Sequence, residues 1–447
     1  MTAGDGTAPR RAALKILARV RGGTPFDAAL EGAVRKLPEP DRRLAHELAA
    51  GVLRARSVLD AALAPLVPRG WSKVAPALQD VLRLGAYQLT ALDRIPPHAA
   101  VSTSVALARA AGGEPAGGFV NAVLRKVAKA PRIAEAPADA ARELAGAGEP
   151  DDAAATRLAE QRSHPEWLVR RWIERYGADG ADALLRWNNT RPALVLQPAR
   201  APLDRLAASL AEAGIATEPA PFGAGLATDA SRPDALPGFA EGAFLVQDPA
   251  QALVAWFADL PPEAVVYDAC AAPGGKTIGI GRGVRGVIAA DASSKRTGRL
   301  AENLRRAGSG REHAIVADAL DPPVRDMDAV LLDAPCLGTG TFARHPDARW
   351  RVTPEALDEL AGRQAALLGA AADTLRPGGL LIYATCSLEP EENERQVDRF
   401  LAARGDFRRE PPDDFPPSLL SPRGDLMILP QRHGMDGAFA ARLRRTR

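Results

Sequence analysis

The sequence predicts a multi-domain protein with an all-α amino-terminal domain (1–145), a small α+β linker domain (146–240) and an α/β domain (241–447). Three observations support this prediction. The chain of 447 residues is too long for one ordinary hydrophobic core. Apolar residues recur with helical spacing in its first part. From about residue 241, short apolar strands alternate with helical stretches, which indicates a mainly parallel sheet with helices on both faces.

The amino-terminal part contains two apolar helical faces: Leu78, Val81, Leu82 and Leu89, followed by Val120, Val123, Leu124 and Val127. Pro96-Pro97 and Gly112-Gly113 punctuate these helices, and no strand-like alternation precedes residue 130. Residues 1–130 contain 19 Lys and Arg against 10 Asp and Glu, whereas the remainder contains 38 against 45. This basic region suggests a nucleic-acid partner, although an arginine-rich solvated surface would carry the same charge.

The middle of the chain changes composition. Residues 131–160 are rich in Ala, Pro, Glu and Asp, which is typical of a linker or a weak helix. Residues 167–172 then predict an amphipathic helix, and residues 192–197 predict a strand.

The α/β part predicts five strands, over residues 264–267, 286–290, 313–316, 328–332 and 380–384. Helical patterns over 296–307 and 354–375 lie between them. Residues 376–379, Arg-Pro-Gly-Gly, predict a turn that feeds the fifth strand.

All three cysteines of the chain, Cys270, Cys336 and Cys386, come directly after a predicted strand. The carboxyl ends of strands in an open α/β sheet face the crevice where ligands bind. One such thiol alone is best explained as a buried structural residue, but three at matching places favour a site. They form neither a disulfide framework nor a zinc spacing, so we expect a reducing, cytoplasmic location and no metal. No apolar run is long enough to span a membrane, and no secretory signal is evident.

The turn after the first strand contains a run that we assign to cofactor binding: Cys270, Ala271, Ala272, Pro273, Gly274, Gly275 and Lys276. Its glycines allow close approach of a ligand at a helix amino terminus, but neither the dinucleotide nor the Walker pattern is present. Asp268, Asp291, Asp318 and Asp333 follow successive strands. One aspartate alone is usually a turn residue, but this ordered set suits S-adenosylmethionine. Asp291 would bind the ribose and Asp318 the adenine, and the other two would offset the sulfonium charge.

These residues resemble the RNA (cytosine-C5) methyltransferases. The matching motifs are Asp-Ala-Cys-Ala-Ala-Pro-Gly-Gly-Lys-Thr (268–277), Asp-Ala-Pro-Cys (333–336), Arg344-His345-Pro346-Asp347 with Trp350, Thr385-Cys386-Ser387 with Glu391, Glu392 and Asn393, Gln247-Asp248, and Asp436-Gly437-Ala438-Phe439. Within that family the chain is most similar to the RsmB/Sun type, which carries an amino-terminal domain like the antitermination factor NusB. Residues 119–125 and 164–167 carry this part of the resemblance.

The resemblance implies a Rossmann-like catalytic domain that uses S-adenosylmethionine to methylate C5 of a cytosine in small-subunit (16S) ribosomal RNA. It implies that Cys386 attacks C6, that Asp333 contacts N3, and that Cys336 assists loss of the C5 proton. We also expect a monomer. Gln197-Pro198-Ala199 replaces the family's frequent Arg-x-Asn, which leaves one RNA-positioning contact open but not the chemistry.

Two alternatives remain at this point. The same chemistry could act on transfer RNA, although the transfer-RNA enzymes generally lack a NusB-like domain. A transcription or assembly factor could keep the domain only to bind RNA and cofactor, but the intact Cys336, Cys386 and Asp333 argue against this. A DNA methyltransferase does not fit, because the chain has Thr-Cys-Ser and no large target-recognition insertion.

Overall fold

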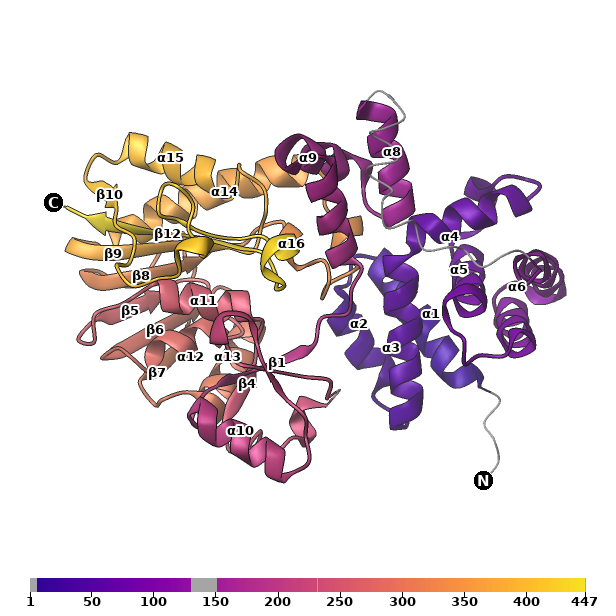
Figure 1. Cartoon of the computed structure of the whole chain (residues 1–447), viewed down its shortest axis with the longest axis horizontal. Coiled ribbons are helices and arrows are strands. Elements are labelled where there is room, and N and C mark those ends of the chain that lie inside the picture. The colour runs from indigo at the N-terminus through magenta and orange to yellow at the C-terminus, as the bar shows by residue number, and fades with distance from the viewer. Residues whose placement is uncertain (1–5, 130–150, 231, 447) are drawn as a thin grey trace. The chain divides into compact units, whose positions relative to one another are not determined.

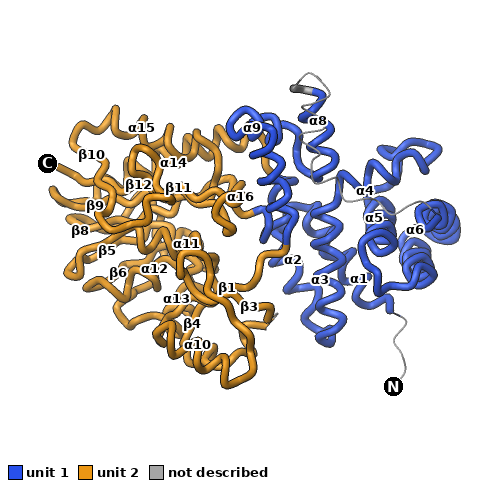
Figure 2. The backbone as a smooth tube through the Cα atoms, viewed as in Figure 1, with its two compact units in different colours: residues 1–190, 342–351 blue, residues 191–341, 352–447 orange. Residues whose placement is uncertain are grey.

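The computed structural model describes residues 6–129, 151–230 and 232–446, which form two compact units (Figure 2). The helical unit contains residues 1–190 and 342–351, and the sheet unit contains residues 191–341 and 352–447. A compact unit can hold more than one domain, so the boundaries expected after residues 145 and 240 stay predictions.

The described part of the helical unit is all-α, as predicted. Its helices are α1 (Thr7–Arg21), α2 (Phe26–Val34), α3 (Glu39–Arg54), α4 (Arg56–Leu63), α5 (Pro76–Ala91), α6 (Pro97–Val127), α8 (Asp151–Arg162) and α9 (Glu166–Asn188). The predicted apolar faces are part of its core, since Val81 and Leu82 of α5 and Val120 and Leu124 of α6 are buried. The expected linker or weak helix over 131–160 lies partly outside the described residues. Its last part, from Asp151 onward, belongs to α8.

The predicted punctuation of α6 is confirmed. Pro96 precedes the helix and Pro97 is its first residue, where a missing backbone N–H costs nothing. Gly112 and Gly113 leave the helical conformation, and Gly113 has a φ of 74°, which favours glycine. This break divides α6 into two helical arms.

A short segment from the α/β part of the sequence, residues 342–351, belongs to the helical unit. The backbone N–H of Phe26 donates to the Asp347 carboxylate at 3.2 Å, and the Trp350 indole N–H donates to the Leu53 carbonyl at 2.8 Å. Nothing in the sequence pattern indicated this packing, because it joins residues about 300 positions apart.

Arg349 holds the same segment from inside the helical unit, where its side chain is completely buried. Its guanidinium donates to the Asn188 carbonyl at 2.6 Å and to the Asn189 side-chain oxygen at 2.7 Å. Burial lowers the pKa of Arg349 to about 9, so the side chain is still charged at neutral pH. The fixed oxygen acceptors around this buried charge specify one position for the segment.

The sheet unit begins with a small antiparallel sheet in the order β2-β3-β1-β4, flanked by α10 (Leu203–Glu212). Its strands are β1 (Leu194–Pro198), β2 (Glu218–Pro219), β3 (Leu226–Thr228) and β4 (Phe244–Val246). The predicted strand at 192–197 is therefore β1, and the helix predicted at 167–172 lies within α9. Gln197, at the departure from the family pattern, is buried and donates to the Ala224 carbonyl at 2.8 Å.

The larger sheet has the order β10-β12-β9-β8-β5-β6-β7, with β11 paired to β12. Its strands are β5 (Val265–Asp268), β6 (Gly286–Asp291), β7 (Glu312–Val316), β8 (Met327–Asp333), β9 (Leu375–Thr385), β10 (Phe407–Arg409), β11 (Leu426–Ile428) and β12 (Ala438–Arg445). Strands β5 to β9 pair in parallel, so the predicted sheet is confirmed. The antiparallel extension by β10 to β12 was not predicted.

Helices cover both faces of this sheet (Figure 1). They are α11 (Pro249–Phe257), α12 (Gly275–Gly281), α13 (Ser294–Ala307), α14 (Pro354–Asp373), α15 (Glu394–Ala403) and the short α16 (Pro430–His433). Leu332 and Tyr383 pack in one buried cluster with α14 and α15, whereas Leu331 and Ile382 pack in another cluster with Ile280 of α12. Alternate residues of a strand point to opposite faces, so burial on both faces explains the continuous apolar runs of the sequence.

The predicted turn at residues 376–379 lies inside β9, where it interrupts the pairing of β9 with β8. Leu375 pairs with Met327, and pairing then resumes between Leu380 and Ala329. Gly378 has a φ of 78°, which lets the chain turn between these two pairs. The strand that carries Cys386 therefore starts earlier than the apolar run suggested.

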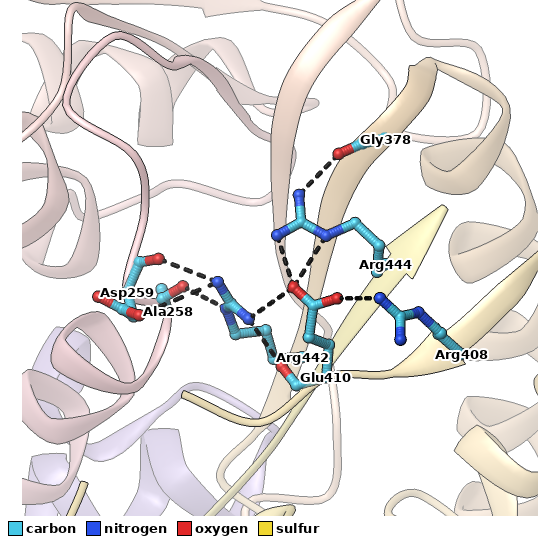
Figure 3. A network of polar contacts seen from close by, with 7 residues as sticks. All are labelled: Ala258, Asp259, Gly378, Arg408, Glu410, Arg442 and Arg444. Atoms are coloured by element: carbon cyan, nitrogen blue, oxygen red, sulfur yellow. Dashed lines mark hydrogen bonds and ion pairs between the residues drawn. The ribbon is translucent and has the colours of Figure 1, made fainter. Parts of the chain in front are cut away.

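Glu410 joins the antiparallel extension to the rest of the sheet unit through three arginines (Figure 3). Its carboxylate accepts from Arg444 at 2.6 Å and from Arg408 at 2.8 Å, while its backbone carbonyl accepts from Arg442 at 2.7 Å. Arg442 also donates to the Ala258 carbonyl after α11, at 3.0 Å. The hydrogen bond from Arg444 is the main cause of a lowered pKa of the Glu410 carboxyl.

We expect Glu410→Gln to lower the free energy of unfolding at pH 7 by about 1–2 kcal/mol, because it removes a charge-assisted interaction. The folded-state pKa of Glu410 is lowered, so its stabilisation is present above the ordinary carboxyl pKa and is lost as the pH falls through the folded-state value. Thermal unfolding midpoints of the two proteins should therefore converge in acid. Glu241→Gln, at an exposed glutamate, is the control, and an equal effect of both changes at pH 7 would contradict the prediction.

Across residues 6–129, 151–230 and 232–446, the structure contains no helix with the length and apolar content that crossing a membrane requires.

Candidate active site

Two thiols meet at the carboxyl edge of the larger sheet. Cys336 lies three residues beyond the end of β8, and Cys386 directly follows β9. These strands are parallel neighbours with Asp333 opposite Ala384, so both turns leave the same edge of the sheet. The two sulfur atoms are 3.4 Å apart. The sequence placed each thiol after a strand, and the structure brings the two together.

Backbone contacts hold the two cysteine loops in register. The N–H of Gly340 donates to the Cys386 carbonyl at 3.0 Å, and the Gly340 carbonyl accepts from Gly437 at 2.8 Å. A side chain at Gly340 would place its Cβ 2.7 Å from the Gly437 Cα, so only glycine allows this approach. The Asp-Gly-Ala-Phe motif near the carboxyl end therefore supports the loop between the two cysteines.

Polar residues buried behind the thiols orient the same loops. Glu392 is completely buried, and its carboxylate accepts the Leu337 N–H at 3.0 Å and the Gln364 amide at 2.9 Å. Burial raises the pKa of Glu392, which these hydrogen bonds partly offset. The hydroxyl of Thr385 donates to the Asn393 side chain at 2.5 Å. Glu392 and Asn393 thus help to fix the positions of the two cysteine loops.

The two thiols share one hydrogen bond, in which either sulfur could be the donor. This hydrogen bond, together with burial, raises the pKa of the Cys336 thiol well above its ordinary value. Cys336 therefore stays protonated at neutral pH and can donate to the sulfur of Cys386. A thiolate that accepts a hydrogen bond is stabilised, and the thiolate is the nucleophilic form of cysteine. The structure thus places a thiol that can donate a hydrogen bond 3.4 Å from the Cys386 sulfur.

Asp333 ends β8 on the same edge and is held by Lys276 of α12. The ammonium donates to the Asp333 carboxylate at 2.7 Å and also to the side-chain oxygen of Gln251 on α11. Lys276 is buried, whereas 33% of the Asp333 side chain is exposed. Lys276 therefore fixes one oxygen of Asp333 while the carboxylate remains accessible to a ligand.

The turn after β5 contains the predicted cofactor run. Gly274 has a φ of 104°, and a Cβ there would lie 2.8 Å from the Leu300 side chain. The chain then enters α12 at Gly275, which lies close to the Gln247 side chain. This turn brings backbone rather than side chains to the edge of the sheet, which allows close approach of a ligand.

Asp268 is buried at the end of β5 and accepts from the Thr277 hydroxyl at 2.6 Å. Burial, with a contribution from Asp333, raises the pKa of Asp268 to about 7. Burial and the nearby carboxylates of Asp268, Asp333 and Asp291 raise the pKa of Cys270 to about 12. Cys270 is therefore a neutral thiol, which agrees with a place in the cofactor turn and not with attack on a substrate.

The two remaining predicted acids have different surroundings. Asp291 is buried after β6 and accepts from the Ser293 N–H at 2.8 Å and from Arg296 at 2.9 Å. Asp318 is exposed after β7 and accepts the Leu320 N–H at 3.0 Å. The strand order β8-β5-β6-β7 places the acids of these four strands in a row along one edge. Lys276 and Arg296 pair with two of these acids, so the row presents carboxyl oxygens that can accept hydrogen bonds from a ligand.

Sequence reasoning missed two residues of this site, Gln251 and Gln364. Gln364 is completely buried on α14, close in sequence to the buried Leu367 and Leu368. A polar residue on the apolar face of a helix was the available signal, because a buried amide requires hydrogen-bond partners. Gln251 is only partly buried and gave no comparable signal.

Three family models match successive parts of the chain. The model described as the NusB family matches residues 7–129, a ferredoxin-like domain of the RsmF/B-like methyltransferases matches residues 164–228, and 16S rRNA methyltransferase RsmB/F matches residues 255–444. All three predicted parts of the fold are therefore confirmed.

Relatives match over nearly the whole chain. The probable ribosomal RNA small subunit methyltransferase B of Synechocystis is 37% identical, over 94% of this chain and 95% of the relative. Ribosomal RNA small subunit methyltransferase B of Pseudomonas putida is 35% identical, over 97% and 98%.

Solved structures show the same fold. The structure of the protein PH0851 has a TM-score of 0.80 and 23% identity over 99% of both chains. A methyltransferase homolog protein from Pyrococcus horikoshii has a TM-score of 0.56 and 24% identity, and covers 65% of this chain and 98% of its own.

Proposed function

The chain belongs to the RsmB/F family of 16S rRNA methyltransferases, and from this premise we propose that it methylates C5 of a cytosine in small-subunit ribosomal RNA with S-adenosylmethionine. The family establishes a small-subunit ribosomal RNA methyltransferase. One observation supports the C5 target and the covalent mechanism. The sulfur atoms of Cys336 and Cys386 lie 3.4 Å apart, and Asp333, which is hydrogen-bonded to Lys276, ends the strand that precedes Cys336.

The residues of the cofactor edge fit S-adenosylmethionine. We assign Asp268 and Asp333 to offset the sulfonium charge, and the turn at Gly274 brings backbone to the edge where the cofactor would bind. Asp291 and Asp318 are proposed to bind the nucleoside, and Arg296 would share the Asp291 carboxylate with the ribose. When bound, this cofactor supplies an electrophilic methyl group.

C5 of cytosine is a weak nucleophile, so the protein must activate it. We assign the attack on C6 to the Cys386 sulfur, because Cys336 keeps its own proton and stabilises the neighbouring thiolate. Addition to C6 makes C5 enamine-like, which divides one difficult step into easier ones. Asp333 is assigned to N3 of the base, where it stabilises the adduct. Lys276 positions Asp333 for this contact.

Release of the product requires removal of the C5 proton and cleavage of the bond between sulfur and C6. Cys336 is assigned to the first of these events. Its pKa is raised chiefly by the hydrogen bond to Cys386, and that bond weakens once the Cys386 sulfur is bonded to carbon. The Cys336 thiol thereby becomes easier to ionise at the stage when a base is needed. The target base must leave its stack to reach these groups, so a loop or an incompletely folded RNA is the expected substrate.

The test uses the whole protein, S-adenosylmethionine labelled in its methyl group, and protein-free small-subunit ribosomal RNA. We expect label in the RNA and a cytosine that resists bisulfite deamination, and neither with Cys386→Ala. Transfer RNA serves as the comparison substrate. Labelled ribosomal RNA without a resistant cytosine would overturn C5 as the target, and label in transfer RNA alone would overturn the substrate assignment.

A further inference from the structure

The helical unit contains a groove of about 280 Å³ between α1, the α3–α4 corner, α5 and the segment 342–351. Four arginines and two aspartates line it: Arg21, Arg56, Arg83, Arg351, Asp80 and Asp347. The lining therefore has an excess of two positive charges. We call it the Arg56 groove.

Three of these arginines are neutralised by carboxylates. Arg21 pairs with Asp80, and Arg83 donates to the same aspartate at 3.1 Å. Arg83 also pairs with Asp60, at 2.6 Å, and is almost completely buried. In the same way, Arg351 binds Asp347 at 2.9 Å. Both aspartates of the groove thus have arginine partners.

Arg56 is different. No carboxylate in the described ranges lies within ion-pair distance of its guanidinium, which instead stacks on the Trp350 ring at 5.0 Å from the centroid. Trp350 is held by its hydrogen bond to the Leu53 carbonyl, so the ring is a fixed platform. Stacking occupies the face of a guanidinium and leaves the N–H groups at its edge available to a ligand. Burial and the charges of Arg83 and Arg21 lower the pKa of Arg56, and the charges of Asp60 and Asp80 partly offset this effect.

We propose that the Arg56 groove binds a backbone phosphate of the ribosomal RNA substrate, with Arg56 as the contacting cation. The proposal rests on the proposed function. A planar guanidinium on an aromatic ring matches two oxygens of a phosphate, and a groove of this size suits a phosphate with its attached sugar. The excess of basic residues in the first 130 positions favours a polyanion over a single acidic side chain.

The experiment measures the affinity of the full-length protein for protein-free small-subunit ribosomal RNA across a range of KCl concentrations. We expect Arg56→Gln to weaken binding roughly ten-fold, the loss of one charge-assisted hydrogen bond. The slope of log Kd against log salt should fall by about 0.7, which corresponds to one phosphate contact. Arg56→Lys keeps the charge, so it should keep the slope but lose part of the affinity.

Arg11→Gln is the matched control, because Arg11 is exposed on α1 about 15 Å along the helix from Arg21 and does not line the groove. Circular dichroism and the unfolding midpoint check that each variant is folded. Equal losses for Arg56→Gln and Arg11→Gln, or none for Arg56→Gln, would overturn the proposal.

The outcomes also separate this proposal from the proposed function. If the wild type methylates the RNA and Arg56→Gln binds it equally well, only the groove assignment fails. If the wild type neither binds nor methylates the RNA, both fail. Decaglutamate serves as the probe for an acidic protein partner. If Arg56→Gln loses binding to decaglutamate but binds the RNA as well as the wild type, the groove serves an acidic protein. That outcome would also overturn the proposal.

Discussion

Replacement of Cys386 by alanine should abolish methyl transfer, with turnover reduced by ~10⁴-fold or more, as for other enzymes that lose a covalent nucleophile. The reason is that neither of the other two cysteines of the chain is suited to take its place. Cys336 retains its proton, and Cys270 is a neutral thiol with a pKa of about 12. The measurement is single-turnover transfer of labelled methyl groups to small-subunit ribosomal RNA.

Cys386→Ser is the informative companion, because it preserves size and a polar atom but its hydroxyl does not ionise at neutral pH. We expect it to be as inactive as Cys386→Ala. Cofactor affinity, measured by titration calorimetry, should be unchanged in both variants and shows that the site is folded. Activity of either variant within ten-fold of the wild type would refute the assignment of Cys386.

Replacement of Cys336 by alanine should have a different effect: a covalent protein–RNA adduct should accumulate. The Cys336 sulfur lies 3.4 Å from the attacking sulfur, so it is suitably placed to receive the C5 proton of a base bonded to Cys386. Without it, attack and methylation proceed but elimination slows. Denaturing gel electrophoresis after incubation with RNA and S-adenosylmethionine would show an RNA-dependent band of reduced mobility.

The double variant Cys336→Ala with Cys386→Ala is the matched control, and its band should disappear because the attacking sulfur is absent. A band that persisted in the double variant would place the covalent bond elsewhere. A band with Cys386→Ala alone would reverse the roles of the two cysteines. The two thiols share one hydrogen bond, so the effects of the single changes are not expected to add.

The sequence by itself determined the fold class and the row of strand ends that carries the site. Apolar strands alternating with helical stretches identified β5 to β8 to within one residue at each end, and β9 except for its first five residues. The reason is that burial on both faces requires continuous apolar runs. Cys270, Cys336 and Cys386 could be assigned to turns for the same reason. Gly112-Gly113 marked the break in α6, since a residue with φ of 74° is readily accommodated only as glycine.

Only the tertiary structure decided how the members of the site act on one another. The 3.4 Å distance between the Cys336 and Cys386 sulfur atoms depends on the register of β8 against β9. The ion pair between Lys276 and Asp333 likewise joins residues 57 positions apart. Local periodicity specifies secondary structure, but no local pattern specifies which distant side chains share a hydrogen bond.

The segment 342–351 shows this limit most clearly. Its residues resemble a family motif, but composition and periodicity contain no signal that Arg349 is buried in the helical unit or that Trp350 supports Arg56. These contacts arise from packing between parts of the chain about 160 to 300 residues apart. The proposed chemistry follows from motifs at strand ends, whereas the stacking of Arg56 on Trp350 became visible only in the folded chain.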